Sequence, residues 1–591
     1  MVRRMSGGIC VALAIALWGP ARLLAGTSDA PVADAAMAGQ TVVIGTLLQQ
    51  GADVNAAQPD GMTALHWAAL NGDADLAAML LYAGANANSS TRLGGYTPLS
   101  MAAENGRATV IRALLKGGAD PNATDWHGTT SLMLASASGS VDAVNDLLAA
   151  GSHVNAVEQV KHETALMFAA ASDRPEVVNV LLEHGADWKV ATTILDWSKV
   201  PNDDPRISPV RGRRSVDANE AAASAAAQGG AARGNAAARS GARAQAGAGG
   251  GNAPPSEGAG GYTALVGAQG GLTALLFAAR DGYADTVQAL LRHGVDVNQI
   301  DSGDRTSPLL IAVINGRFDV AEQLLQAGAN PNLAASNGVT PLYAVVNCVW
   351  ADKALYPQPQ AYKQQKTDYL TLMNDLLDHG ADANARLRKE VWYADYNQDQ
   401  KGLDETGATA FWRAAYSADV DAMKLLVAHG ADPNISTEKL PPRRAYPPRS
   451  EAKKDYSGLP PVPVGGPDIS PLLAASGEGY GWSLTANHHI FAPAGPLPAV
   501  KYLVEVLHAD VNERDAEGNT ALDNAAARGD NEMIEYLVSK GGDITVLNRS
   551  GQSVADMANG PVERVSPFAD TIALAKRLGA KLLHACISCG G

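Results

Sequence analysis

The stretch that decides the fold runs from Thr97 to Asn122 and reads TPLSMAAENGRATVIRALLKGGADPN. Thr is a good helix N-cap, and Pro directly after it takes the first helical position, where its missing N–H costs nothing. Leu99 and the two alanines that follow it give an apolar stripe with little bulk. Gly106 and Gly118 suit the left-handed caps that end helices. The stretch therefore predicts two short, closely packed helices followed by a turn.

The same unit recurs along the chain. A degenerate copy with Ala30-Pro31-Val32 comes first, and the other openings stand at Thr63, Thr97, Thr130, Thr164, Thr273, Ser307, Thr340, Thr409, Ser470, Thr520 and Ser553. Seven of the eleven spacings are 33 or 34 residues, and the other four are one period plus an insertion. A Gly-Ala-Asp-x-Asn ending, as in Gly118–Asn122, closes most units, and turn formation explains its Asp and Asn. One such unit cannot bury its apolar face alone, so the units must stack.

This pattern resembles the ankyrin-repeat family, whose unit is a turn–helix–helix of roughly 33 residues that opens with Thr-Pro-Leu-His. The resemblance implies an all-α solenoid of about twelve helix-turn-helix repeats, with short finger turns and several long insertions. It also implies a non-enzymatic scaffold that binds proteins through its concave face and fingers. Only His66 retains the histidine of the family. We therefore expect apolar contacts to replace most of the polar network that this histidine supports.

Insertions divide the repeats into two groups, residues 27–190 and residues 271–580. Between them, residues 191–270 are rich in Ala, Gly and Arg without apolar periodicity, which predicts a disordered loop. This basic loop could dock onto an acidic partner or onto the acidic stack. A solvent-exposed loop that binds nothing is the simpler interpretation. The flanking repeats lack polar capping faces, so we expect one continuous stack across it. Smaller insertions at 347–367 and 477–496 interrupt the turn between two helices, and those at 386–405 and 436–467 extend the fingers.

The N-terminus and the net charge restrict location and partners. Arg3 and Arg4 precede an apolar run, Ile9–Trp18, and the small residues Ala25-Gly26, which predicts a secretory signal peptide over residues 1–26. A buried N-terminal helix is the alternative. We expect a secreted or periplasmic protein without an integral membrane segment once this peptide is removed. With 61 Asp and Glu against 46 Lys and Arg, the net charge is −15, so nucleic acid is not an expected partner.

Aromatic residues are concentrated in one part of the chain. Sixteen of the 31 Phe, Trp and Tyr residues lie between Tyr343 and Phe491. We predict that they form a surface for a protein partner of unknown identity, although they could equally pack the insertions against the stack. Binding of a cell-envelope polysaccharide is an alternative, with Trp392, Tyr393, Trp412 and Trp482 stacking on sugar rings. The predicted binding residues are Trp392, Tyr393, Tyr396, Trp412, Tyr416, Tyr446, Tyr480 and Trp482.

The last motif whose side chains could be reactive is the C-x-x-C of Cys586 and Cys589. A c-type haem site would need His at position 590, where Gly590 stands, and a zinc site would need four ligands. His584 supplies at most a third ligand, so we expect a disulfide rather than a metal, with a role as accessory to a redox enzyme as a further alternative. No Ser/His/Asp set is identifiable from order or spacing. The sequence therefore predicts no catalytic residues, no cofactor, no metal site and no enzyme.

Overall fold

The computed structural model describes residues 29–199, 267–350, 360–391, 403–441, 454–481, 490–561, 566–586 and 589. These residues contain 24 α-helices and two short β-strands. The helices form twelve consecutive pairs, one for each predicted repeat, which confirms the all-α helix-turn-helix solenoid. The chain divides into two units, residues 1–153 and residues 154–591, which are described separately.

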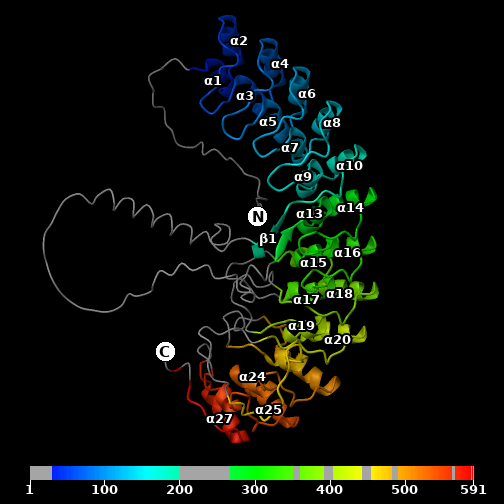
Figure 1. The fold of residues 1–591 in the computed structure, drawn as a ribbon, viewed down its shortest axis with the longest axis vertical. Coiled ribbons are helices and arrows are strands. Elements are labelled where there is room, and N and C mark those ends of the chain that lie inside the picture. The colour runs from blue at the N-terminus through cyan, green and yellow to red at the C-terminus, as the bar shows by residue number, and fades with distance from the viewer. Residues whose placement is uncertain are drawn as a thin grey trace, which may run out of the picture. The chain divides into compact units, whose positions relative to one another are not determined.

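Unit 1 contains four helix pairs. They are α1 (Pro31–Met37) with α2 (Thr41–Gln49), α3 (Ala64–Asn71) with α4 (Ala74–Tyr82), α5 (Pro98–Glu104) with α6 (Ala108–Lys116), and α7 (Ser131–Ser138) with α8 (Val141–Ala149). The odd-numbered helices pack side by side as an inner row, and the finger turns project beyond that row (Figure 1). The degenerate first copy is a true repeat, because Val32, Ala33 and Ala36 are fully buried in α1.

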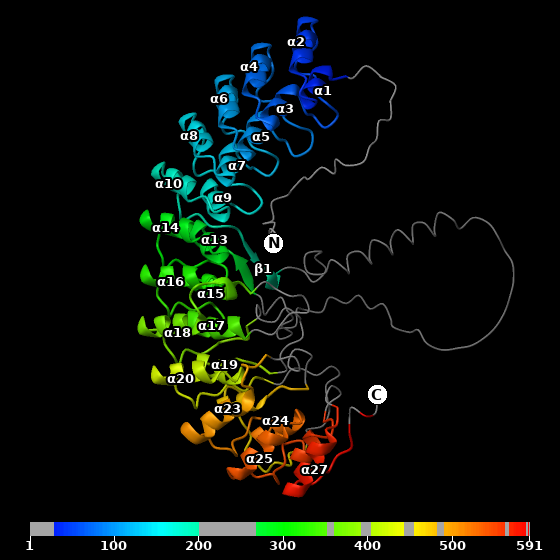
Figure 2. The ribbon, with the colours of Figure 1, turned by 180° about the vertical axis from the view of Figure 1, so that it is seen from behind.

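Unit 2 contains the other eight pairs. They are α9 (Ala165–Ala171) with α10 (Pro175–Glu183), α13 (Ala274–Asp281) with α14 (Ala284–Arg292), α15 (Pro308–Ile314) with α16 (Phe318–Gln326), α17 (Pro341–Val349) with α18 (Tyr369–Asp378), α19 (Ala410–Tyr416) with α20 (Val420–Ala428), α21 (Pro471–Ser476) with α23 (Pro496–Lys501), α24 (Ala521–Ala527) with α25 (Asn531–Ser539), and α26 (Val554–Met557) with α27 (Ala569–Leu578). Helix α23 continues as a π-helix, η4 (Tyr502–Val506), and a 3-10 turn, η2 (Ala361–Gln364), precedes α18. The view from behind shows the same two rows of helices in this unit (Figure 2).

The repeats continue across the largest insertion. Helix α13 packs directly on α9, and α14 packs on α10, so the expectation of one stack across it is met. Strand β1 (Ile194–Asp196) pairs antiparallel with β2 (Ala268–Gly270), and the 3-10 turn η1 (Trp197–Lys199) follows β1. Both ends of the predicted loop 191–270 are therefore ordered, which corrects its boundaries. The prediction of disorder for residues 200–266 falls outside the described residues.

Each repeat begins and ends for the reasons that the sequence indicates. Thr97 Oγ1 accepts a hydrogen bond from the N–H of Ser100 at 3.1 Å, and Thr130 Oγ1 accepts one from Met133 at 3.3 Å. Gly72 and Gly139 end their helices with φ of 77° and 84°, in the left-handed region that favours glycine. The paired alanines of the inner helices are fully buried, which lets neighbouring helices approach closely.

A side-chain bridge joins most of the endings that carry this asparagine to the following repeat. In the ending 118–122, Asn122 donates through Nδ2 to the Gly151 carbonyl at 3.1 Å and accepts at Oδ1 from the His153 N–H at 2.8 Å. Asp120 acts within the turn, where its Oδ1 accepts from the Asn122 N–H at 2.9 Å. We call the first pair of bonds the asparagine bridge. Seven other asparagines in the described residues make it, namely Asn55, Asn88, Asn155, Asn298, Asn332, Asn384 and Asn512.

One ending departs from this arrangement. Asn434 donates through Nδ2 to Asp432 of its own turn at 3.0 Å instead of reaching the next repeat. The second helix of that next repeat ends in the π-helix η4, and His508 stands where the other repeats have glycine, with φ of 59°. The missing glycine and the missing bridge therefore occur at the same junction.

The residues at the position of the family histidine make more hydrogen bonds than we expected from the sequence. His66 accepts from the Thr63 N–H at 3.1 Å, and its Nε2 lies 3.1 Å from the carbonyl of Tyr96, just before the next helix opening. Burial lowers the pKa of His66 to about 4, so the ring is neutral at neutral pH and Nε2 is the donor. Asp523, at the same position in α24, accepts from the N–H and hydroxyl of Thr520. Met and Leu fill this position in five other repeats, so the expected apolar replacement is only partly right.

Candidate partner-binding surface

Two of the predicted binding aromatics are core residues. Trp412 is 0% exposed and Tyr416 is 1% exposed, and their rings stack with 5.4 Å between centroids. Trp412 Nε1 donates to the Ile469 carbonyl at 2.9 Å, just before the next helix opening. This is the bond that His66 makes in its own repeat, so Trp412 replaces the histidine in joining two repeats. Neither ring is available to a partner, and the structure corrects the prediction for both.

A buried arginine explains why these rings are enclosed. The Arg413 side chain is fully buried, donates from Nε to Asn347 Oδ1 at 2.9 Å and from Nη2 to the Trp350 carbonyl at 2.8 Å. It also hydrogen-bonds Ser417 Oγ and lies 3.9 Å from the buried carboxylate of Glu405. A buried charge is tolerated only when it is paired and hydrogen-bonded, as here. Arg413 was not predicted as a functional residue, and its one signal in the sequence is a charged residue between Trp412 and the paired alanines Ala414 and Ala415 of an inner helix.

The described ends of the insertions pack against the repeats. Trp350 Nε1 and the Tyr369 hydroxyl both donate to Asp419 Oδ2, at 2.7 and 2.9 Å. Burial and the negative charge of Asp419 raise the pKa of Tyr369, which keeps it a donor. The N–H of Ala492 donates to the Ser417 carbonyl at 2.8 Å. Packing, the alternative left open by the sequence, therefore holds for Trp350 and Tyr369 beside the insertion at 347–367.

The other predicted binding residues are less buried or not described. Tyr480 is half-buried. Trp392, Tyr393, Tyr396, Tyr446 and Trp482 lie outside the described residues. Their predicted role stays a prediction.

The most exposed tryptophan of the described chain lies in unit 1, outside the aromatic-rich quarter. Trp126 is 65% exposed and Leu93, on the preceding finger, is 71% exposed. The Trp126 N–H donates to the Gly94 carbonyl at 3.0 Å, and its indole lies over Gly95, where an added Cβ would stand 2.6 Å from Cδ1. The absence of a side chain at Gly95 therefore lets the indole pack closely against the neighbouring finger. We call Leu93, Tyr96 and Trp126 the finger patch.

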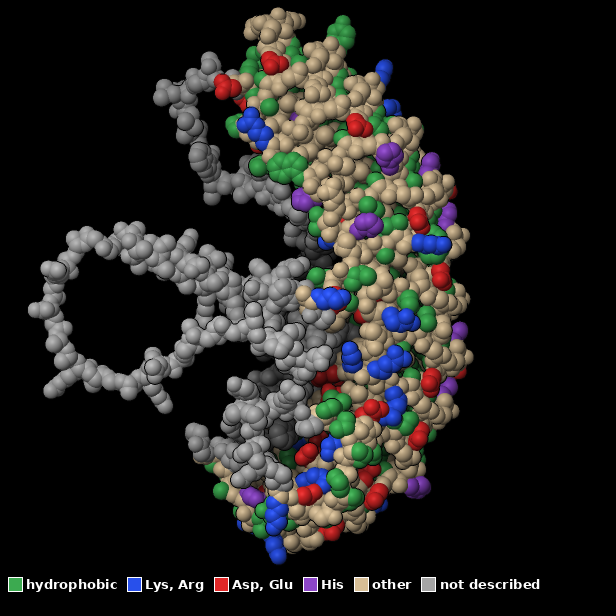
Figure 3. All heavy atoms as spheres, viewed as in Figure 1, with side chains coloured by type: hydrophobic (Ala, Val, Ile, Leu, Met, Phe, Trp, Pro, Cys, Tyr) green, Lys and Arg blue, Asp and Glu red, His purple; other side chains and the backbone are tan. Residues whose placement is uncertain are grey.

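An apolar row on the inner helices accompanies the finger patch in unit 1. Trp67, Met101 and Leu134 are the fourth residues of α3, α5 and α7, and each is half-buried. Trp67 Nε1 donates to Gln58 Oε1 at 2.8 Å, and Gln58 in turn donates to Asp34 at 2.7 Å. On the face shown in Figure 3, charged side chains are sparser over α1–α8 than over α13–α20. Partly exposed apolar side chains held in place by packed helices and hydrogen bonds are typical of protein recognition.

The C-terminal cysteines are joined in a disulfide, the pairing that the sequence favours, with 5.4 Å between their Cα atoms.

In the described part of the chain, no three His, Cys, Asp or Glu side chains are grouped so that they could hold a metal ion. No helix of that part is both long enough and apolar enough to cross a bilayer.

Family comparisons agree with this architecture. A three-copy ankyrin-repeat model matches residues 32–125, 83–158, 124–192 and 260–348, a single-repeat model matches 406–438, and a many-copy model matches 488–538. Together these ranges cover more than half of the chain. This chain is an ankyrin-repeat protein. Ankyrin repeats generally mediate protein–protein interaction, and the unmatched ranges include most of the insertions.

Curated relatives of this ankyrin-repeat protein share only part of its length. It is 40% identical over 67 residues to ankyrin repeat and SAM domain-containing protein 6 of Rattus norvegicus, covering 11% of this chain and 8% of the relative. The Danio rerio protein of the same name is 29% identical over 162 residues, 27% of this chain and 21% of the relative. A putative ankyrin repeat-containing protein of Treponema pallidum (strain Nichols) is 33% identical over 147 residues, 25% of this chain and 39% of the relative. The chain thus spans well under half the length of each.

Substitution of Trp412 tests its core role. We expect Trp412→Ala to lower the free energy of unfolding by about 3–5 kcal/mol, because it leaves a large cavity and removes an inter-repeat bond. Trp412→Phe keeps most of the ring and loses the bond to Ile469, so we expect a smaller loss of about 1–3 kcal/mol. Urea denaturation of the full chain measures both. An alanine variant as stable as the wild type would contradict the core assignment.

Proposed function

We propose that this ankyrin-repeat protein is a non-enzymatic scaffold that binds a protein partner through the finger patch and the inner row of unit 1. The observation that carries the proposal is Trp126, a large ring that is 65% exposed while its position is fixed on Gly94 and Gly95. A tryptophan held in this way loses little conformational entropy on binding, which makes it a suitable anchor. Leu93 on the neighbouring finger adds apolar area beside it.

The charge of unit 1 indicates the chemistry of the partner. Residues 29–153 carry eleven Asp and Glu against four Lys and Arg. An acidic unit with an exposed apolar patch favours a partner that is apolar where it meets Trp126 and basic elsewhere on the same face. We therefore propose a protein with a basic, partly apolar face.

The aromatic-rich quarter gives less support to polysaccharide binding. Of the rings proposed to stack on sugars, Trp412 is fully buried in the stack. The others, Trp392, Tyr393 and Trp482, lie outside the described residues. Protein binding through unit 1 is therefore the function that the described residues favour.

We further propose that the scaffold acts in the cell envelope or outside the cell. The support is the sequence of residues 1–26, with Arg3 and Arg4 ahead of the apolar run Ile9–Trp18. N-terminal sequencing of the protein recovered from the producing cells tests this. We expect a mature chain in the envelope or secreted fraction that begins close to Ala25–Thr27. A chain in the cytosolic fraction that retains Met1 would contradict the proposal.

The binding surface is tested by a matched pair of variants. We expect Leu93→Ala with Trp126→Ala to abolish partner capture, because both exposed apolar groups of adjacent fingers are removed. Tyr82→Ala is the control, since Tyr82 is 96% exposed but lies at the end of the outer helix α4. Crosslinking and mass spectrometry of the tagged full chain in its native cells measures capture and maps the contacts.

We expect crosslinks on the fingers and inner helices of unit 1 in the wild type and in Tyr82→Ala, and none in the double variant. All three proteins should melt within about 2 °C of one another, because exposed side chains contribute little to stability. Equal loss of capture in Tyr82→Ala, or crosslinks confined to unit 2, would contradict the assignment.

A further inference from the structure

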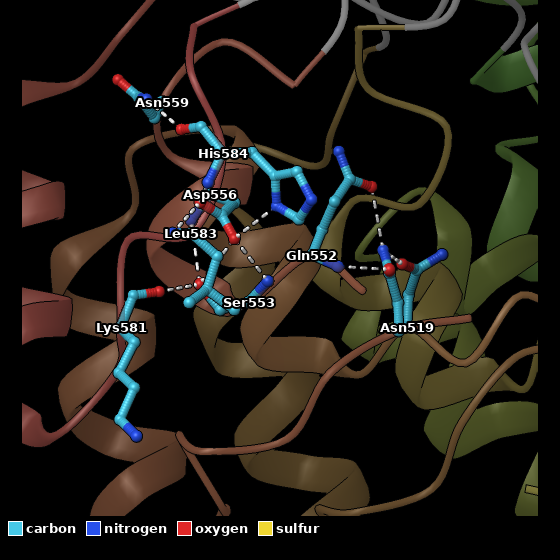
Figure 4. A network of polar contacts seen from close by, with 9 residues as sticks. Asn519, Gln552, Ser553, Asp556, Asn559, Lys581, Leu583 and His584 are labelled. Atoms are coloured by element: carbon cyan, nitrogen blue, oxygen red, sulfur yellow. Dashed lines mark hydrogen bonds and ion pairs between the residues drawn. The ribbon is translucent and has the colours of Figure 1, made fainter. Parts of the chain in front are cut away.

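The C-terminal tail is fixed to the last repeat by one carboxylate. After α27 the chain turns back at Gly579, and Asp556 Oδ1 accepts from the N–H groups of Leu583 and His584 at 2.7 and 2.8 Å. Asp556 Oδ2 accepts from the Ser553 N–H at 2.9 Å and lies 3.2 Å from His584 Nδ1 (Figure 4). Burial acts to raise the pKa of Asp556, but these hydrogen bonds outweigh it and lower the pKa. The carboxylate is therefore ionised at neutral pH and holds the tail.

The tail takes the place of a further finger. Asp556 stands at the position that His66 and Trp412 occupy in their helices, and all three reach the backbone of the segment that follows their own repeat. Ser553 Oγ donates to the Lys581 carbonyl, and Asn559 Nδ2 donates to the His584 carbonyl at 3.2 Å. Residues 581–584 therefore close the end of the finger row, and the cysteine pair follows directly.

The disulfide itself does not hold this tail. Cys586 and Cys589 are three residues apart, so their bond links the tail only to itself. A disulfide that closes so short a loop removes little entropy from the unfolded chain. Cys586 is half-buried and Cys589 is exposed, whereas the contacts that fix the tail lie before them. The pair thus includes an exposed cysteine, follows a segment that is fixed to the last repeat, and links no separate elements of the fold.

We propose that Cys586 and Cys589 form a thiol–disulfide exchange site for cysteine thiols of a protein substrate. A substrate thiolate attacks Cys589 Sγ, the Cys586–Cys589 bond breaks, and Cys586 leaves as a thiolate that takes up a proton. A second substrate thiolate then attacks the substrate sulfur of the mixed disulfide and releases Cys589, which is protonated in turn. The substrate dithiol is oxidised to a disulfide, and its two electrons reduce the pair to two thiols.

Cys348 differs from the C-terminal pair in its expected reactivity. It is the unpaired cysteine of the described residues, and it is half-buried beside the insertion at 347–367. Burial raises the pKa of its thiol to about 12, so almost none is thiolate at neutral pH and it is a poor nucleophile. Among the cysteines of the described residues, exchange should therefore be confined to the C-terminal pair, and Cys348→Ser should leave it unchanged.

The test mixes the oxidised full-length protein with a fully reduced synthetic peptide that contains two cysteines. We expect one peptide disulfide per protein chain, a gain of two hydrogens in the protein mass, and maleimide labelling at Cys586 and Cys589. The folded protein should react, and its melting temperature should change by less than about 2 °C on reduction. Cys348→Ser should react fully, and Cys586→Ser with Cys589→Ser should not react.

Three results would overturn the proposal. The first is a protein mass that gains no hydrogens on reduction, since no disulfide would then exist. The second is reduction that occurs only when the chain unfolds. The third is a large fall in melting temperature on reduction, which would make the bond a structural link. None of these depends on whether unit 1 binds a partner.

Discussion

The asparagine bridge is the interaction on which the continuity of this molecule depends. One side-chain amide, such as that of Asn122, uses its donor and its acceptor on the backbone of the following repeat, at 3.1 and 2.8 Å. Each bond is worth about 1 kcal/mol at most when it is exposed to water, but both fix the register of neighbouring turns. Since a repeat contacts only its neighbours, a link of this kind at nearly every junction sets where all the fingers lie. The finger patch of unit 1 exists because adjacent fingers are held side by side.

The bridge also explains how the array accommodates its insertions. Asn332 reaches Gly380 and Asn384 reaches Gly430, so the bonded residues are 48 and 46 apart in sequence rather than about 30. The added residues therefore lie between bridged turns without breaking the bridge, and the described residues Asn347, Trp350 and Glu405 contact the buried Arg413. Other contacts replace the bridge at the largest insertion, where Thr286 donates to Asp173 at 2.8 Å. At the end of the array, Asp556 makes the final link, to the tail.

Local signals made most of the fold predictable, and contacts between distant segments made the site unpredictable. Thr97, Gly72 and the paired alanines act within one repeat, so the sequence shows the number and limits of the helices. The recurring Asn was visible too, but the prediction that turn formation explains both Asp and Asn is right only for the Asp, because the partners of the Asn lie in the next repeat. Trp412 follows a helix opening and is fully buried beside Arg413, whereas Trp126 stands on a finger over Gly95 and is 65% exposed. Exposure depends on what the other segments cover, which periodicity does not reveal.

The most direct test of this account is hydrogen–deuterium exchange, followed by mass spectrometry, on the full chain with Asn332→Ala and with Asn434→Ala. Asn332 bridges to the turn 380–384, whereas Asn434 bonds Asp432 of its own turn. We predict that Asn332→Ala speeds exchange in the turn 380–384 by up to about thirtyfold, because two bonds of at most about 1 kcal/mol each are lost. Asn434→Ala should leave exchange in residues 508–512 unchanged. Equal behaviour of the two junctions, or no change in the turn 380–384, would contradict the central role of the bridge.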